Sequence, residues 1–313
     1  MPYKSNPQVF SSSIVETVIG TGDKALALGG ENVLMFYRFD GEIKNPPAVG
    51  IEFSDLGPDR SIPGIAALYE GADTLAEIAK RAEQVPGVQF VSIKLEGADP
   101  NGADEPVEVS VAKVKQVAEV LSLPLVVQGS DNVDKDAELL AKVAEALQGK
   151  NALLLSAKEE NYKGIAVAAV TAYGQKIAGE SAVDINLAKQ LNVLIAQMGI
   201  GSENLVAHLG NAAAGYGFEY ISSTFERVKL AALSQGDAAL QVPIISPVGA
   251  DAWGVKETMV SEEDFPEWGP REERGIEMEI CTAVAYLAAG GNAVILRHPA
   301  SIAAVSQMIA ELV

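Results

Sequence analysis

Short apolar runs alternate with amphipathic windows from Val49 to the end of the chain. Eight runs are rich in residues that favour β-strands, at residues 50–54, 88–95, 124–128, 152–156, 175–180, 205–209, 242–246 and 293–297. Between these runs, apolar residues recur every three or four positions, as along one face of a helix; Leu75, Ile78 and Ala82 form the first such stripe. The repeated alternation predicts a parallel sheet covered by helices.

Eight strand–helix units favour one particular α/β fold, the TIM (β/α)8 barrel, over residues 49–313. A doubly wound open sheet is the alternative, but no G-x-G-x-x-G motif follows the first strand to support a dinucleotide-binding version of it. Residues 161–173 form the least regular helical window, because their valines also suit a strand. We predict a helix there.

Two segments lie outside the repeat. Residues 1–48 contain the apolar run 33–39 and a turn signal at Asp40 and Gly41, which together predict an N-terminal arm with a strand or hairpin. This arm either closes the N-terminal end of the barrel or reaches another chain. Residues 247–273 form a long insertion after the seventh strand, on the face where loops follow strands, so we expect a lid or a docking surface.

Composition narrows the class of protein. The chain has 313 residues, 48% of them hydrophobic and 21% charged, so it can bury a folded core. Lys and Arg number 23 against 42 Asp and Glu, and the net charge of −19 argues against nucleic acid and membrane as partners. Residues 1–13 lack the pattern of a signal peptide, and the longest uncharged stretch, 280–296, is too short for an ordinary membrane span. We therefore expect a cytoplasmic protein.

Cysteine and histidine are scarce. A single cysteine, Cys281, cannot form an internal disulfide or hold an iron–sulfur cluster. With only His208 and His298 beside it, a closed zinc site has no support, and we predict no metal ligands. His208 lies in an apolar strand and is interpreted as a hydrogen-bonded barrel residue.

Polar residues at strand ends are candidates for chemistry. Strand alternation directs Glu52 and Lys94 into the barrel on adjacent strands, and Gln128 and Arg297 join the same inner set. An opposite-charge pair there is either a catalytic acid with an amine or, more often, a structural ion pair. His298 precedes Pro299 at the mouth and suits a general base, a ligand-contacting group or a structural hydrogen bond.

The segment after the sixth strand is rich in small residues. Asn211, Gly215, Tyr216 and Gly217 occur there just before a helix, so the backbone could approach a flat ligand closely; a tight turn alone is the other interpretation. No phosphate-binding G-K-S loop, G-x-S-x-G elbow or H-E-x-x-H pair occurs in the sequence. We therefore predict no catalytic residues.

Four ordered segments carry a resemblance that extends over nearly the whole chain. They are GGENVLMFYRFDGEIKNPPAVGIEFSD (29–55), DINLAKQLNVLIAQMGI (184–200), GYGFEYISSTFERVKLAAL (215–233) and LRHP (296–299). Together they resemble the small subunit of the corrinoid iron–sulfur protein, also called the delta subunit of acetyl-CoA decarbonylase/synthase.

The resemblance implies a non-catalytic TIM-barrel subunit in a heterodimer. Its large partner subunit carries a 4Fe-4S cluster and a cobalamin-binding domain, and the corrinoid lies between that domain and the barrel mouth. The cobalt accepts a methyl group from methyltetrahydrofolate through a separate methyltransferase and delivers it to acetyl-CoA synthase/CO dehydrogenase. The family serves the reductive acetyl-CoA pathway of carbon fixation in anaerobes.

Loop placement, rather than the resemblance, suggests which residues face the corrinoid. We predict cofactor contacts from Asn211, Gly215, Tyr216, Gly217, Arg297 and His298. Neither histidine lies in a D-x-H-x-x-G motif, so we predict no bond from this chain to cobalt. Two alternatives remain: a pterin-dependent barrel methyltransferase, for which the strand ends offer Glu96, Gln128 and Ser156 but no clear Asp and Asn pair, and a purely structural partner subunit.

Overall fold

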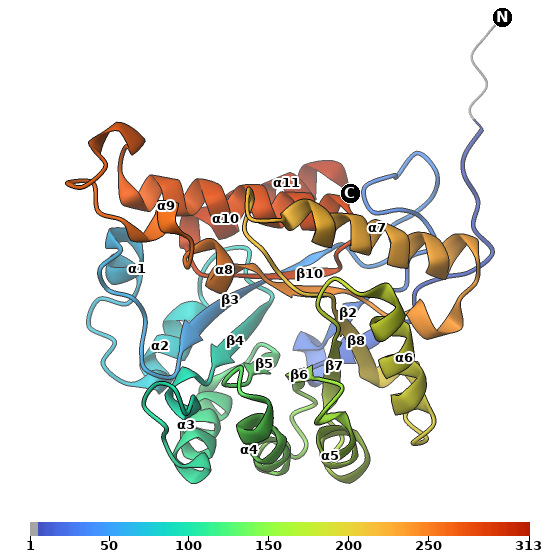
Figure 1. Cartoon of the computed structure of the whole chain (residues 1–313), viewed down its shortest axis with the longest axis horizontal. Coiled ribbons are helices and arrows are strands. Elements are labelled where there is room, and N and C mark those ends of the chain that lie inside the picture. Colours follow the sequence, from blue (N-terminus) through green and yellow to red (C-terminus); the bar gives the residue numbers. More distant parts are fainter. Residues whose placement is uncertain (1–5) are drawn as a thin grey trace, which may run out of the picture.

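Eight parallel strands form a barrel at the centre of the computed structural model, which describes residues 6–313 (Figure 1). The strands are β3 (Ala48–Ser54), β4 (Phe90–Lys94), β5 (Leu125–Gln128), β6 (Leu153–Ala157), β7 (Lys176–Glu180), β8 (Leu205–His208), β9 (Ile245–Pro247) and β10 (Ala293–Leu296). Their order is β8-β7-β6-β5-β4-β3-β10-β9, and a parallel bridge between Ala207 and Ile244 joins the two end strands. The predicted TIM barrel is thus confirmed.

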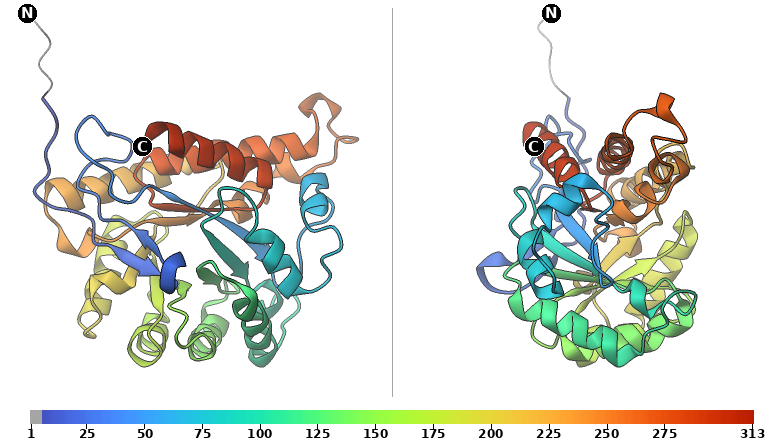
Figure 2. Two further views of the ribbon diagram at one scale, coloured as in Figure 1. Left: turned by 180° about the vertical axis from the view of Figure 1, so that it is seen from behind. Right: turned by 90° about the vertical axis from the view of Figure 1, so that its left-hand side faces the viewer.

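Helices surround the strands on the outside of the barrel (Figure 2). They are α1 (Pro63–Leu68), α2 (Leu75–Ala82), α3 (Val107–Val120), α4 (Val133–Ala146), α5 (Tyr162–Ala166), α6 (Ile185–Ala196), α7 (Phe218–Ser234), α8 (Val248–Ala252), α9 (Lys256–Met259), α10 (Arg271–Ala288) and α11 (Pro299–Leu312). The helix predicted for residues 161–173 is confirmed, since α5 continues directly into a π-helix at Val167–Ala172. Among residues 6–313, none of the helices has the length and apolar character that crossing a membrane requires.

The barrel interior changes from apolar to polar along the strands. At the N-terminal end, inward residues such as Phe90, Val126 and Ile295 form an apolar cluster. Gly50 is needed in this layer because a Cβ there would collide with the ring of Phe90. Further along, the inward positions become polar, starting with Glu52 on β3. Strand alternation therefore places a polar layer at the C-terminal end of the barrel.

The N-terminal arm closes the opposite end of the barrel. An antiparallel hairpin of β1 (Thr17–Ile19) and β2 (Leu26–Leu28) packs Ile19 against the interior apolar cluster. The Thr17 hydroxyl donates a hydrogen bond to the Leu205 carbonyl at 2.8 Å. Of the two roles expected for the arm, the structure shows closure of its own barrel. We propose that the arm spans residues 1–48 and the barrel residues 49–313, since the first barrel strand, β3, begins at Ala48, next to this boundary.

The hairpin of the arm is formed by β1 and β2, whereas the apolar run 33–39 forms no strand. These residues form turns, and Phe36 has φ of 64°, which interrupts an extended backbone. Val33 and Met35 are nevertheless buried. Leu34 and Phe36 also pack against the core, whereas Tyr37 and Phe39 at the end of the run are exposed.

A buried ion pair attaches the arm to the barrel wall. Lys229 on α7 donates to Glu31 of the arm at 2.6 Å and to the Asn292 side-chain oxygen at 2.7 Å. Asn292 in turn donates to Glu31 at 2.9 Å, and all three residues are at most 2% exposed. Burial lowers the pKa of Lys229, and the charge of Glu31 opposes this effect. Each charge is therefore tolerated only in the presence of the other.

Removing one partner of this pair tests its contribution to stability. We expect Glu31→Leu to lower the free energy of unfolding by about 3–5 kcal/mol, because it leaves the Lys229 ammonium buried and unpaired. The double variant Glu31→Leu/Lys229→Met should recover most of the loss in urea denaturation. Glu16→Gln, which weakens the exposed pair with Lys44, is the control and should cost less than about 1 kcal/mol. Equal stability of the single and double variants would contradict the assignment.

Candidate functional site

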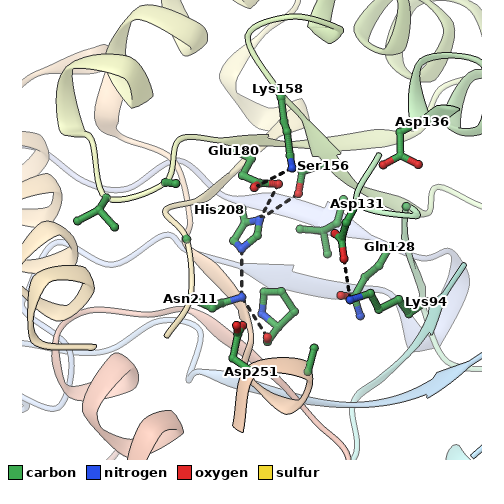
Figure 3. Close-up of a pocket in the computed structure, with 17 residues that line it drawn as sticks. Lys94, Gln128, Asp131, Asp136, Ser156, Lys158, Glu180, His208, Asn211 and Asp251 are labelled. Atoms are coloured by element: carbon green, nitrogen blue, oxygen red, sulfur yellow. Dashed lines mark hydrogen bonds and ion pairs between the residues drawn. The ribbon is translucent and has the colours of Figure 1, made fainter. Parts of the chain in front are cut away.

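A cavity of about 400 Å³ lies at the C-terminal end of the barrel, and we call it the mouth cavity (Figure 3). Lys94, Gln128, Glu180 and His208, the last residues of β4, β5, β7 and β8, all line it. Parallel strands end at one rim, so side chains far apart in sequence meet there. The mouth cavity is thus built from the polar layer of the barrel.

His208 is held by hydrogen bonds at both ring nitrogens. Its Nδ1 lies 3.0 Å from the Ser156 hydroxyl and 3.4 Å from a Glu180 carboxylate oxygen. The Asn211 amide nitrogen donates to the Pro247 carbonyl at 3.0 Å and lies 3.2 Å from His208 Nε2. Because the carbonyl can only accept, this orientation makes Asn211 a donor to Nε2 and assigns the ring proton to Nδ1.

This arrangement differs from a catalytic triad. In a triad, the serine and the carboxylate face opposite nitrogens of the imidazole. Here Ser156 and Glu180 both face Nδ1 of His208. The geometry therefore orients His208 and provides no relay that would activate the serine.

Glu180, which lines the mouth cavity, is ionised at neutral pH. Burial raises its pKa, but the hydrogen bond from His208 Nδ1 and the charge of Lys158, 3.3 Å away, outweigh this effect and lower the pKa to about 2. Glu180 therefore carries its charge at neutral pH and cannot serve as a general acid there.

The opposite wall leaves acceptor groups free. Lys94 pairs with Asp131 at 2.8 Å, and Asp136 accepts hydrogen bonds from Ser130. The Asp251 carboxylate makes no side-chain hydrogen bond or ion pair within residues 6–313, and burial raises its pKa. In the same part of the chain, the buried side-chain oxygen of Asn211 also lacks a partner. The Asn211 oxygen is buried and calls for a donor from water or a ligand, whereas Asp251 is half-buried and its carboxylate remains open to solvent in the cavity.

A second cavity of about 190 Å³, which we call the side cavity, lies next to the mouth cavity at the end of β3. The Arg297 side chain reaches into its wall and pairs with Glu52 at 2.5 Å. Gln128, which lines the mouth cavity, donates to the other oxygen of Glu52 at 2.7 Å. The inward positions predicted for Glu52, Lys94, Gln128 and Arg297 are confirmed, but Glu52 pairs with Arg297 and not with Lys94.

The residues predicted to contact the cofactor lie at separate places in the structure. Asn211 lines the mouth cavity and Arg297 lines the side cavity. His298 is only 4% exposed: its Nδ1 accepts a hydrogen bond from Ala300 N–H at the start of α11, and its Nε2 lies 3.1 Å from Glu272. Burial lowers the pKa of His298, and Glu272 offsets part of this effect. Its ring nitrogens are thus used for helix capping and an internal contact.

Gly215, Tyr216 and Gly217 lie on the rim and line neither cavity. Both glycines have positive φ, 85° and 93°, which the turn into α7 requires. The Tyr216 hydroxyl donates to Glu257 on α9 at 2.6 Å. This bond joins the loop after β8 to the insertion after β9 on the same face of the barrel.

Five residues that line the mouth cavity were not predicted from the sequence: Asp131, Asp136, Lys158, Glu180 and Asp251. Glu180 had a usable signal, because it ends a predicted strand and barrel sites gather at strand ends. The other four lie in loops or helices, where no periodic pattern indicates direction. Within residues 6–313, no group of three or more His, Cys, Asp or Glu side chains could hold a metal ion, and Cys281 is exposed.

The fold places this chain among the α/β barrel proteins. Its barrel is similar to solved dihydropteroate synthases: the Yersinia pestis enzyme with a pterine-sulfa conjugate has a TM-score of 0.52 and 14% identity, covering 84% of this chain and 93% of that one. The Vibrio fischeri enzyme has a TM-score of 0.55 and 10% identity, with 95% and 97% covered. At these identities the likeness shows an α/β barrel alone.

The sequence identifies the family. Residues 16–310 match the family described as CO dehydrogenase/acetyl-CoA synthase delta subunit, and the chain belongs to this family. It is 33% identical to the acetyl-CoA decarbonylase/synthase complex subunit delta of Archaeoglobus fulgidus over 98% of this chain and 69% of that protein. The subunit delta 2 of Methanosarcina acetivorans is also 33% identical, over 92% and 66%. The chain thus spans about two thirds of these relatives' length, and the resemblance found in the sequence is confirmed.

Glu180 provides a pH test of the mouth cavity. Its pKa is lowered from 4.5 to about 2, so the ionised carboxylate stabilises the folded state above about pH 4.5, and this contribution is lost as the pH falls towards 2. We expect Glu180→Gln to cost on the order of 3 kcal/mol at pH 7 and less than half of that at pH 3. Urea denaturation at several pH values measures this difference. The exposed neighbour variant Glu160→Gln should have no such effect, and a pH-independent loss for Glu180→Gln would contradict the ion-pair account.

Proposed function

We propose that this chain is the non-catalytic barrel subunit of a heterodimeric corrinoid methyl carrier, and that its mouth covers one side of the corrinoid. Membership of the delta subunit family supports an assembly, because the relatives are named as subunits of the acetyl-CoA decarbonylase/synthase complex. The large partner would supply the 4Fe-4S cluster and most of the corrinoid site. The methyltetrahydrofolate methyltransferase and acetyl-CoA synthase/CO dehydrogenase are the further partners, in the cytoplasm.

The observation that carries this proposal is an apolar rim around a polar hollow. Large exposed apolar side chains follow the ends of four different strands: Leu56, Val183, Tyr216, Tyr220 and Met259. Leu56, Val183, Tyr216 and Met259 lie between a barrel strand and the next helix of the barrel wall, and Tyr220 lies in the first turn of α7, so all five are on the face of the mouth cavity. Exposed apolar groups around a polar cavity are typical of a docking surface. A corrin ring, with apolar faces and amide-bearing edges, matches such a surface.

The residues of this chain would position and shield the corrinoid without a bond to its metal. The cobalt supplies the methyl-accepting chemistry when the corrinoid is bound. His208 and His298 have both ring nitrogens engaged by other groups of the chain, which favours the absence of a cobalt ligand here. The free acceptors Asp251 and Asn211 fit the amide donors of a corrin edge. The rim would exclude water from the enclosed face.

Purification with the partner tests the proposal directly. The chain, co-expressed with the large subunit in an anaerobic host, should form a stoichiometric complex with corrinoid absorbance bands and about one cobalt per heterodimer. Loss of the corrinoid when the barrel chain is omitted would support a shared site. A stable complex without corrinoid bands would instead support the purely structural subunit.

A pterin-dependent methyltransferase is the second candidate. Its support is the cavity wall where Asp251 and Asn211 lie together, an acid and amide combination that the sequence alone did not bring together (Figure 3). Calorimetry of the isolated chain with methyltetrahydrofolate separates the two functions. We expect no tight binding; micromolar binding that Asp251→Asn abolishes would favour the methyltransferase and contradict the carrier role.

The rim loop offers a mutational test of corrinoid retention. A Cβ added at Gly215 meets no atom within 4 Å, so a bulky side chain has open space at this rim position, and the strain of the positive φ stays within the loop, outside the barrel core. We expect Gly215→Phe to weaken corrinoid retention by about tenfold or more, measured as cobalt per complex after dilution. Gly215→Asn is the matched control, because asparagine tolerates positive φ and is smaller. Unchanged cobalt content in Gly215→Phe would count against a corrinoid at this rim.

A further inference from the structure

Glu279 is a completely buried carboxylate that the proposed function does not use. It lies on α10, is 0% exposed, and accepts hydrogen bonds from the backbone N–H groups of Arg297 at 2.6 Å and His298 at 3.2 Å. These two residues form the corner between β10 and α11. Glu279 therefore holds the backbone of a residue, Arg297, whose side chain lines the side cavity.

Two buried donors beside Glu279 make no hydrogen bond. The Ser301 hydroxyl on α11 and the Trp253 indole N–H, just after α8, have no partner within residues 6–313. Burial raises the pKa of Glu279 to about 7, while the Ser301 hydroxyl and the Trp253 indole are close enough to lower it in part. The folded chain therefore contains both the protonated and the ionised form near neutral pH.

The two forms of Glu279 need different partners. An ionised carboxylate only accepts hydrogen bonds, and it attracts both free donors, because a bond to a charged acceptor is stronger than one to a neutral acceptor. A protonated carboxyl has an O–H to donate, which the Ser301 oxygen can accept, and it attracts the Trp253 N–H less. Gain or loss of one proton thus changes the pull on the Trp253 indole.

Trp253 connects this cluster to the side cavity. Its indole lines the cavity, and its ring stacks on the His298 ring at a centroid distance of 5.9 Å. It also packs against Gly275, one turn before Glu279 on α10, where a Cβ would collide with the ring. A shift of the indole towards or away from α10 therefore changes the wall of the side cavity.

No charged side chain makes a hydrogen bond or ion pair with Glu279 in the described part of the chain. The Arg297 guanidinium pairs with Glu52, and its charge is near enough that Glu279 raises the pKa of Arg297. The His298 ring faces Glu272, and burial lowers the pKa of His298. Charged groups on the neighbouring helices have other contacts: Lys229 with Glu31, Lys256 with the Phe265 ring, Glu257 with Tyr216, and Asp251 at the mouth cavity.

We infer that Glu279, Ser301 and Trp253 form a proton-controlled switch beside the mouth. Ionisation of Glu279 draws the Trp253 indole towards α10, and protonation releases it, so that the side cavity has two shapes. The switch rests on these buried groups alone and does not depend on the corrinoid role.

The pH dependence of stability reports the buried proton. Because the pKa of Glu279 is raised above its ordinary value of 4.5, the contribution of this group to stability is full below about pH 4.5 and is lost as the pH rises through about 7. The melting temperature of the full chain should therefore fall more steeply with rising pH over this range than that of Glu279→Gln. Parallel pH profiles of the two proteins would overturn the buried proton.

Tryptophan emission reports the movement. Trp253 and Trp268 are the only tryptophans, so a Trp268→Phe background isolates Trp253. Its emission should change in one step with a midpoint near pH 7, and Glu279→Gln should abolish the step. Glu272→Gln, on the same helix and in contact with His298, is the matched control and should keep it. No step in the background protein, or a step that persists in Glu279→Gln, would overturn the switch.

Ser301→Ala tests the switch without removing the carboxylate. Loss of a donor to the ionised form should move the emission midpoint upwards by about half a pH unit or more. Ser306→Ala, on the exposed side of the same helix, should leave the midpoint unchanged. This pair also covers the case in which Glu279→Gln does not fold. An unchanged midpoint in Ser301→Ala would overturn the proposal, because a merely structural carboxylate predicts that result.

Discussion

All eight barrel strands run in one direction, and this constraint determines where every functional group can lie. Hydrogen bonds between neighbouring strands fix the register, so that Lys94 is paired with Gln128 and Glu52 with Ser92. Because alternate side chains point inward, one apolar layer and one polar layer follow from the sequence of each strand. The polar layer can exist only where solvent or a ligand reaches it, which is the C-terminal end.

The rest of the chain covers the N-terminal end of the barrel and leaves the C-terminal end accessible. At the N-terminal end, the β1–β2 hairpin supplies apolar side chains, and the pair of Glu31 and Lys229 holds the arm against the wall. At the other end, loops and the insertion around α8 and α9 leave two cavities and several large apolar side chains exposed. Because only this end of the barrel is accessible, we expect a partner or ligand to bind at the mouth.

Much of the barrel could be predicted because its signals are local. Strand runs and helical stripes extend over a few residues, and even the irregular helix at 161–173 followed from its spacing. The inner position of Arg297 followed from alternation, but its pairing with Glu52 joins residues 245 positions apart and depends on which strands close the barrel. His298 could not be assigned as a helix cap from the sequence, because capping depends on the direction of nearby N–H groups. Asp251 lies on a short helix of the insertion, where no period indicates its direction.

Hydrogen–deuterium exchange of the chain, alone and in its corrinoid-loaded complex, tests the central claim most directly. If the mouth covers the corrinoid, amides at residues 54–59, 181–184, 211–220 and 255–268 should become protected on assembly, while the hairpin at residues 17–28 should exchange as before. Protection confined to the hairpin end or to the outer surface of α3 and α4, with unchanged exchange at the mouth, would contradict the account.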